Sequence, residues 1–233
     1  MLVELRRRLT ALANPGAAAF AQRFFKTGAG GYAEGDVFMG IRVPAVRALA
    51  REFRALPEAE AFTLLASPLH EERLLALLLL VEASRRGDEA AKARIYRGYM
   101  ARRRYVNNWD LVDTSAPPIV GGHLAGTSRA PLDRLARSRN LWDRRIAIIA
   151  TQHFIRAGQF DDTLRIADLL LEDAADLIHK AVGWMLREVG NRDRRVEDDW
   201  LAARYRSMPR TMLRYAIEKF PERERQRYLR GTR

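Results

Sequence analysis

Trp109 and Asp113 stand four positions apart in the stretch YVNNWDLVDTSAPP, residues 105–118, in a chain that reads mostly as apolar helices. Residues four apart lie on the same face of a helix, so this spacing places a carboxylate beside a large aromatic ring. A carboxylate and the face of an aromatic ring both attract positive charge. The pair therefore predicts a site for a group that is, or becomes, cationic.

The charge of the whole chain contrasts with that of Asp113. Its 41 lysines and arginines outnumber its 29 aspartates and glutamates, which gives a formal net charge of +12 and a pI near 10.7. The excess is spread along the chain, and it favours a polyanionic partner, of which nucleic acid is the commonest. Charge alone is not specific, so a basic surface that only keeps the protein in solution remains an alternative.

The chain has no cysteine, which excludes disulfides and thiolate metal sites and fits a reducing cytosol. The longest apolar run, LLALLLLVEA from Leu74, is about half as long as a bilayer span, and the first residues lack a signal-peptide core. We therefore expect a cytoplasmic protein with no membrane partner, and we expect it to be a monomer.

Helical periodicity runs through almost the whole chain. Apolar residues recur at three- and four-residue steps in residues 44–56, 57–67, 88–104 and 162–173. No segment alternates apolar and polar residues for long enough to suggest a strand. The sequence predicts an all-α fold.

A longer period connects these helices. Arg73, Arg145, Lys180 and Arg214 each stand just before an apolar helical stretch, at intervals of 72, 35 and 34 residues, with Trp109 at the midpoint of the first interval. A two-helix unit of about 35 residues is typical of an α-solenoid of the HEAT or TPR kind, and the TPR-specific pattern is absent. We therefore predict a single HEAT-like repeat domain over residues 1–233, an α-solenoid of helix pairs with a curved, basic concave face.

Equivalent positions in stacked repeats face the same way, so this register groups side chains on one surface, usually the concave one. Trp142 and Trp200 fall outside the register and are expected to be ordinary core residues. The expected surface carries Trp109, Arg145 and Lys180, with Asp113, Ile149 and Trp184 one helical turn further on.

Other kinds of site have less support. The four histidines show no metal-ligand spacing, so no metal and no cofactor are expected, and no serine has a base and an acid beside it in the sequence. The glycine-rich stretch of residues 26–44 lacks the ending of a nucleotide-binding loop. We interpret it as a flexible loop that Lys26 and Arg42 could hold against phosphates.

At NNWDLVD (107–113), LWDRRIAI (141–148) and HKAVGWMLRE (179–188), the sequence resembles the AlkD family of DNA alkylation repair glycosylases. The resemblance extends more loosely from RFFKTG and GIRVP near the start to YAIEKF near the end. It implies HEAT-like repeats that form a basic concave groove for double-stranded DNA, and excision of cationic N3- and N7-alkylated purines.

The resemblance also implies roles for particular residues. Asp113 stands at the family's essential carboxylate, and Trp109 and Trp184 stand at its active-site tryptophans. Arg145 stands at its DNA-contacting arginine, and Phe24 lies near the place of an active-site aromatic that is usually tyrosine. Further expected DNA contacts are Lys180, Arg144, Lys26 and Arg42.

Such a reaction would explain why Asp113, a carboxylate, stands in a chain that is mostly basic. An alkylated purine already carries a positive charge, so its glycosidic bond breaks without a general acid and leaves a sugar with oxocarbenium character. Asp113 would stabilise that cation and orient the attacking water. Two alternatives stay open: a non-catalytic DNA-binding member of the same superfamily, and a HEAT-type scaffold that binds proteins.

Overall fold

The computed structural model describes all residues from 1 to 233, and it confirms the all-α prediction. The only extended pairing is an isolated parallel bridge between Val37 and Leu69. The chain forms two compact units, Met1–Ile119 and Val120–Arg233, and each is described by itself. No helix is both long enough and apolar enough to cross a membrane.

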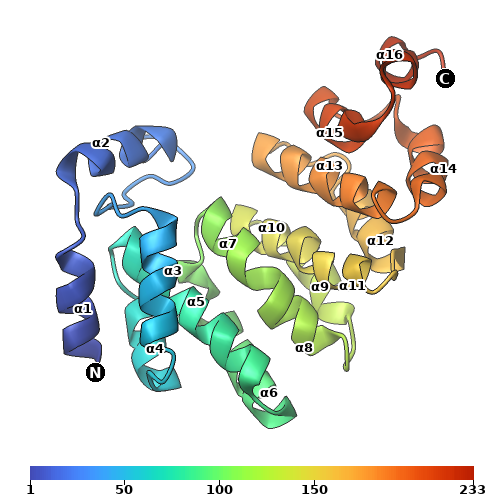
Figure 1. Ribbon diagram of the computed structural model, residues 1–233. Coiled ribbons are helices and arrows are strands. Elements are labelled where there is room, and N and C mark those ends of the chain that lie inside the picture. Colours follow the sequence, from blue (N-terminus) through green and yellow to red (C-terminus); the bar gives the residue numbers. More distant parts are fainter. The chain divides into compact units, whose positions relative to one another are not determined.

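The first unit is a stack of helix pairs around α5 (Figure 1). Helices α3, α5 and α7 pack in succession as one layer, and α4 and α6 pack on α5 from its other side. Every residue of α5 from His70 to Val81 is buried, and the run from Leu74 to Val81 is apolar all round, as expected for a central helix. The helices are α1 (Leu2–Thr10), α2 (Pro15–Phe24), α3 (Val43–Glu52), α4 (Glu58–Leu65), α5 (His70–Arg86), α6 (Glu89–Arg102) and α7 (Trp109–Ser115), with a 3-10 turn at Arg103–Tyr105.

The second unit repeats this layering. Helices α10, α13 and α15 pack in succession, while α9, α12 and α14 pack against their other side. The two units thus share the helix-pair layout of an α-solenoid. The helices are α8 (Gly122–Leu124), α9 (Ala130–Ala136), α10 (Leu141–Ala150), α11 (Gln152–Arg156), α12 (Asp161–Leu169), α13 (Asp176–Gly190), α14 (Arg194–Arg204), α15 (Arg210–Ala216) and α16 (Glu222–Arg230), with a 3-10 turn at Ile217–Lys219.

A π-helical segment, Ala116–Gly121, continues the chain from α7 to α8. Pro117 and Pro118 within it lack backbone N–H groups, so an ordinary α-helical turn cannot be completed there. The helices predicted from periodicity are all present. Their ends differ by a few residues, as at α3, which ends at Glu52 because the following residues form a turn.

Helix α2 differs from the others because none of its side chains is buried. Asn14 caps it by accepting from the Ala17 amide at 2.9 Å, and the Asn14 amide donates to the Met39 carbonyl at 2.9 Å. At Gly40 a Cβ atom would lie 2.2 Å from the Asn14 carbonyl oxygen, so only glycine allows this close approach. The start of helix α2 is therefore fixed to the rest of the unit through backbone contacts.

Candidate functional site

Helix α7 carries both residues of the predicted pair on one face. Trp109 is its first residue and Asp113 its fifth, and both are partly buried. The fully buried Asn108 is the N-cap of the helix, and its Oδ1 accepts from the Trp109 amide at 2.8 Å. The local sequence therefore fixes where the helix starts and which face presents the ring and the carboxylate.

Trp109 belongs to an aromatic cluster, whose members are Phe24, Phe25, Phe38, His70 and Trp109. Phe25 stacks on the Trp109 ring with centroids 5.3 Å apart, and Phe24 meets it edge-on at 6.3 Å. Phe38 stacks on Phe25 at 4.8 Å and on His70 at 4.2 Å. The structure therefore brings Phe24 to Trp109, and it adds Phe25 and Phe38, which sequence analysis missed.

His70 connects this aromatic cluster to two carboxylates. Its Nε2 lies 2.8 Å from Asp110 Oδ2, and its Nδ1 lies 3.3 Å from Asp36 Oδ2. Burial disfavours the charged ring, but hydrogen bonds to Asp110 and Asp36 outweigh it and raise the pKa of His70. Burial also opposes ionisation of Asp36, yet hydrogen bonding to His70 and the charge of Arg73 lower its pKa.

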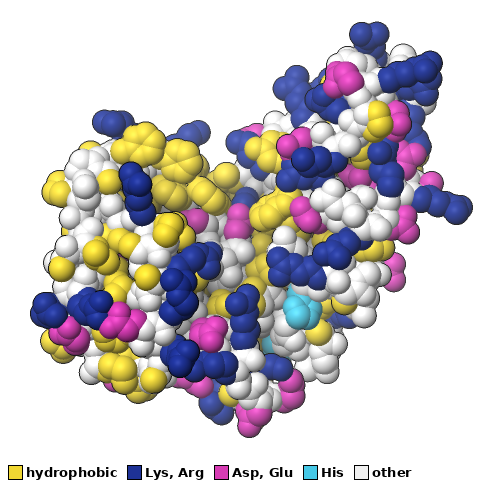
Figure 2. All heavy atoms as spheres, in the orientation of Figure 1, with side chains coloured by type: hydrophobic (Ala, Val, Ile, Leu, Met, Phe, Trp, Pro, Cys, Tyr) yellow, Lys and Arg dark blue, Asp and Glu magenta, His cyan; other side chains and the backbone are white.

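A pocket of about 430 Å³ opens beside the aromatic cluster, between α2 and the body of the first unit. Phe25, Phe38, His70 and Asp110 form part of its wall, and the exposed Arg42 lies at its edge. Figure 2 shows hydrophobic side chains gathered over α2. On this helix Phe20 and Phe24 are 63% and 56% exposed, and their rings stack on each other at 6.3 Å.

In the second unit, the two arginines of α10 make internal contacts. Arg145 is only 5% exposed and donates to the Leu177 carbonyl at 2.7 Å, which ties α10 to the start of α13. Arg144 pairs with Asp173 through two of its nitrogens and donates to the Ser138 and Arg139 carbonyls at 3.0 Å. The sequence predicted DNA contacts for both arginines, and it did not anticipate these internal contacts.

Helix α13 carries Lys180 and Trp184 one turn apart. Lys180 Nζ lies 2.7 Å from Asp176 Oδ2, an ion pair that lowers the pKa of Asp176. Trp184 is partly buried, and its Nε1 donates to Glu188 Oε1 at 3.1 Å. Lys180 and Trp184 are therefore more accessible than Arg145, and each has an acidic neighbour on the same helix.

The glycine-rich stretch is irregular, as the sequence predicted. Lys26 adopts a left-handed backbone with φ of 53°, and its ammonium lies 6.0 Å from the Tyr32 ring centroid. Arg42 precedes α3. The two remaining tryptophans, Trp142 and Trp200, are 8% and 5% exposed, which confirms them as core residues.

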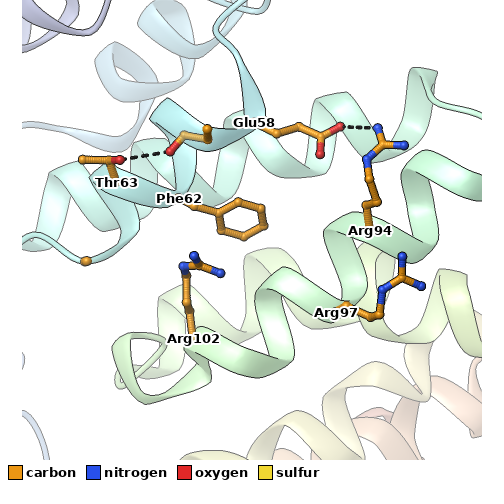
Figure 3. Close-up of a pocket in the computed structure, with 8 residues that line it drawn as sticks. Glu58, Phe62, Thr63, Arg94, Arg97 and Arg102 are labelled. Carbon is orange, nitrogen blue, oxygen red and sulfur yellow. Dashed lines mark hydrogen bonds and ion pairs between the residues drawn. The ribbon is translucent and has the colours of Figure 1, made fainter.

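A second pocket, of about 670 Å³, lies between α4 and α6 (Figure 3). One of its arginines lies against an aromatic ring, with the Arg102 guanidinium 4.8 Å from the Phe62 centroid, and Arg94 pairs with Glu58 at 2.9 Å. Arg97 also lines it. This basic pocket was not predicted, because the spacing of arginines along α6 does not show which ring faces them.

The fold places the chain among helical-repeat proteins, and the comparisons with known proteins are more specific. The chain matches the DNA alkylation repair enzyme family over residues 5–220. It therefore belongs to that family, which confirms the resemblance drawn from its motifs.

A solved structure described as a predicted DNA alkylation repair enzyme from Enterococcus faecalis has the same fold. It superposes with a TM-score of 0.69 at 18% sequence identity, covering 90% of this chain and 97% of that chain. No curated protein matches the chain.

Proposed function

We propose that this member of the DNA alkylation repair family is a glycosylase that hydrolyses the N-glycosidic bond of cationic N3- or N7-alkylated purines in double-stranded DNA. The observation that carries the proposal is helix α7, which presents Trp109 and Asp113 on one face, with the Trp109 ring stacked on Phe25. Such an enzyme would be a hydrolase that begins base excision repair.

The chemistry matches what these two side chains offer. The positive charge of an alkylated purine makes it a good leaving group, so the protein needs no acid to protonate it. As the bond breaks, the sugar becomes cationic, and an ionised Asp113 would stabilise it and orient the water that attacks. Stacking on Phe25 holds the Trp109 ring in place. The ring face opposite Phe25 would contribute roughly 0.5 to 2 kcal/mol of cation–π attraction.

We propose that both units carry residues that contact DNA. Trp184 and Lys180 would contribute from α13, and Phe24, Lys26 and Arg42 from the first unit. The net charge of +12 supports this assignment. Arg144 and Arg145 would reach a phosphate only by giving up part of their internal hydrogen bonds. We keep a single domain, a monomer and a cytoplasmic location as parts of the proposal.

The test is release of N7-methylguanine from duplex DNA under single-turnover conditions. Asp113→Asn keeps the shape of the side chain and removes its charge, so we expect the rate of base release to fall on the order of a hundredfold or more. Affinity for undamaged DNA should be unchanged or slightly higher, because a carboxylate near phosphates repels them.

Glu172→Gln is a matched control, since it removes one negative charge from an exposed position in the second unit. Equal release by the wild-type protein and Asp113→Asn would remove Asp113 from the mechanism. Absence of release by the wild-type protein, with DNA binding retained, would favour the non-catalytic alternative.

A further inference from the structure

His70 lies between two carboxylates, and this position determines its protonation. The side chain is 2% exposed, and its two ring nitrogens lie 2.8 Å from Asp110 Oδ2 and 3.3 Å from Asp36 Oδ2. An ionised carboxylate oxygen can only accept a hydrogen bond, so each nitrogen must donate one. A neutral imidazole has a single N–H, so with both carboxylates ionised the two contacts fit the doubly protonated, cationic ring.

The two carboxylates support that form, whereas the charge of Arg73 opposes it. Arg73 donates to Asp36 Oδ1 at 2.6 Å, so the buried Asp36, His70 and Arg73 and the partly buried Asp110 form one group in which the cationic ring is balanced by a carboxylate. Hydrogen bonds to Asp110 and Asp36 raise the pKa of His70 despite burial. The charged groups that face the ring are Asp36 from the loop before α3, Asp110 from α7 and Arg73 from α5, and the adjoining pocket also contains Glu71 and Arg42.

This charged group is attached to the first turn of α7 at two points. Asp110 is the second residue of the helix, directly after Trp109, and Asn108 is its cap. Asn108 Nδ2 donates to Asp36 Oδ2 at 3.3 Å, while its Oδ1 accepts from the Trp109 amide at 2.8 Å. The residues on both sides of Trp109 are thus bonded to the His70 and Asp36 pair.

We propose that His70 is a positioning residue for the candidate site: held between Asp36 and Asp110, it fixes the first turn of α7 and so the orientation of Trp109 and Asp113. The inference rests on the proposed function for its effect on base release. When the ring loses a proton, one of its two carboxylate contacts loses its donor. If the contact to Asp110 is lost, the start of the helix is held less firmly and the carboxylate of Asp113 is less well placed.

The first test requires no enzymatic activity. An NMR titration of the four histidines of the full chain, assigned by single substitutions, should place the pKa of His70 above the ordinary value of about 6.5. Asp110→Asn keeps the size and an oxygen acceptor but removes a charge, so it should lower the pKa of His70. His153 is the reference, because burial and nearby arginines lower its pKa. A pKa of His70 below the ordinary value would overturn the proposal.

The second test is the pH profile of single-turnover base release. The wild-type rate should fall on the alkaline side with the pKa that NMR gives for His70, and Asp110→Asn should move that fall to lower pH by the same amount. His70→Gln should lower the rate about tenfold at neutral pH and remove that dependence, with the Kd for DNA unchanged within about twofold. His153→Gln is the control for loss of a histidine and should leave the profile unchanged.

The outcomes separate the two proposals. If the wild-type protein releases no base at any pH, the proposed function is contradicted, and the titration alone then decides whether His70 is the cation that its position requires. If the wild-type protein is active and the pH profile of Asp110→Asn superposes on the wild-type profile, His70 does not position the site. If His70→Gln does not fold, Asp110→Asn still provides the test.

Discussion

The buried carboxyl of Glu197 makes the stability of the second unit depend on pH. Glu197 lies on α14 and is 2% exposed, and its Oε1 has no hydrogen-bond partner. Burial raises the pKa of Glu197 to about 8, with the charge of Asp198 acting in the same direction and those of Arg194 and Arg187 opposing it. The side chain is therefore mainly protonated in the folded protein at neutral pH.

The direction of this pH dependence follows from the number of protons that the folded and unfolded states bind. Above about pH 4.5 the unfolded chain releases a proton that folded Glu197 retains, so the free energy of unfolding falls as pH rises towards the folded pKa. With these two pKa values, the loss between pH 5 and pH 7 is roughly 2 to 3 kcal/mol. Glu197→Gln keeps the size of the side chain and cannot ionise, so this variant lacks the loss.

The assay is urea unfolding at pH 5 and pH 7 for the wild-type protein, Glu197→Gln and the exposed control Glu172→Gln. From pH 5 to pH 7, the free energy of unfolding of Glu197→Gln should rise relative to that of the wild-type protein by about 2 to 3 kcal/mol, and by less if the site relaxes around the ionised carboxylate. The free energy of unfolding of the control should differ from that of the wild-type protein by the same amount at both pH values. If Glu197→Gln and wild type have the same pH dependence, the carboxyl is not held protonated.

Two further predictions concern DNA binding and packing. Lys180→Gln should weaken binding to every duplex alike and lower the slope of log affinity against log salt by about one, as expected for loss of a phosphate contact; an unchanged slope in a salt titration would exclude Lys180 from the DNA surface. Gly98→Ala would place a Cβ atom 2.3 Å from Phe62 and displace its ring from Arg102, so we expect a net destabilisation of about 1 to 2 kcal/mol despite the better helix propensity of alanine. Thermal unfolding measures it, and a stabilised variant would contradict the packing described.

The periodicity of apolar residues predicted the features that depend on one helix alone. The four-residue spacing of Trp109 and Asp113 was sufficient to place them on one helical face, since that depends only on the geometry of a helix. The repeat register was less accurate. Trp109 is the first residue of its helix because Asn108 caps it there, whereas Arg145 and Lys180 are each the fifth.

Contacts between distant segments could not be read from the chain. His70 meets Asp36 and Asp110 across 34 and 40 positions, and Asp36 comes from a loop with no periodicity. The repeat register placed Arg145 at the surface, but its side chain is buried and donates to the Leu177 carbonyl, which lies in a different helix. The packing that brings these groups together is tertiary, so no local pattern predicts it.

The lack of buried side chains in α2 determines how this helix exchanges its amide hydrogens. Little apolar area would be exposed if α2 opened locally, so its opening free energy is small compared with that of α5, and its amides should exchange early. Asn14 holds one end of the helix, and the contact of Phe24 with Trp109 holds the other. Anything that covers Phe20 and Phe24 would therefore slow exchange in this helix first, without any change in the stability of the core.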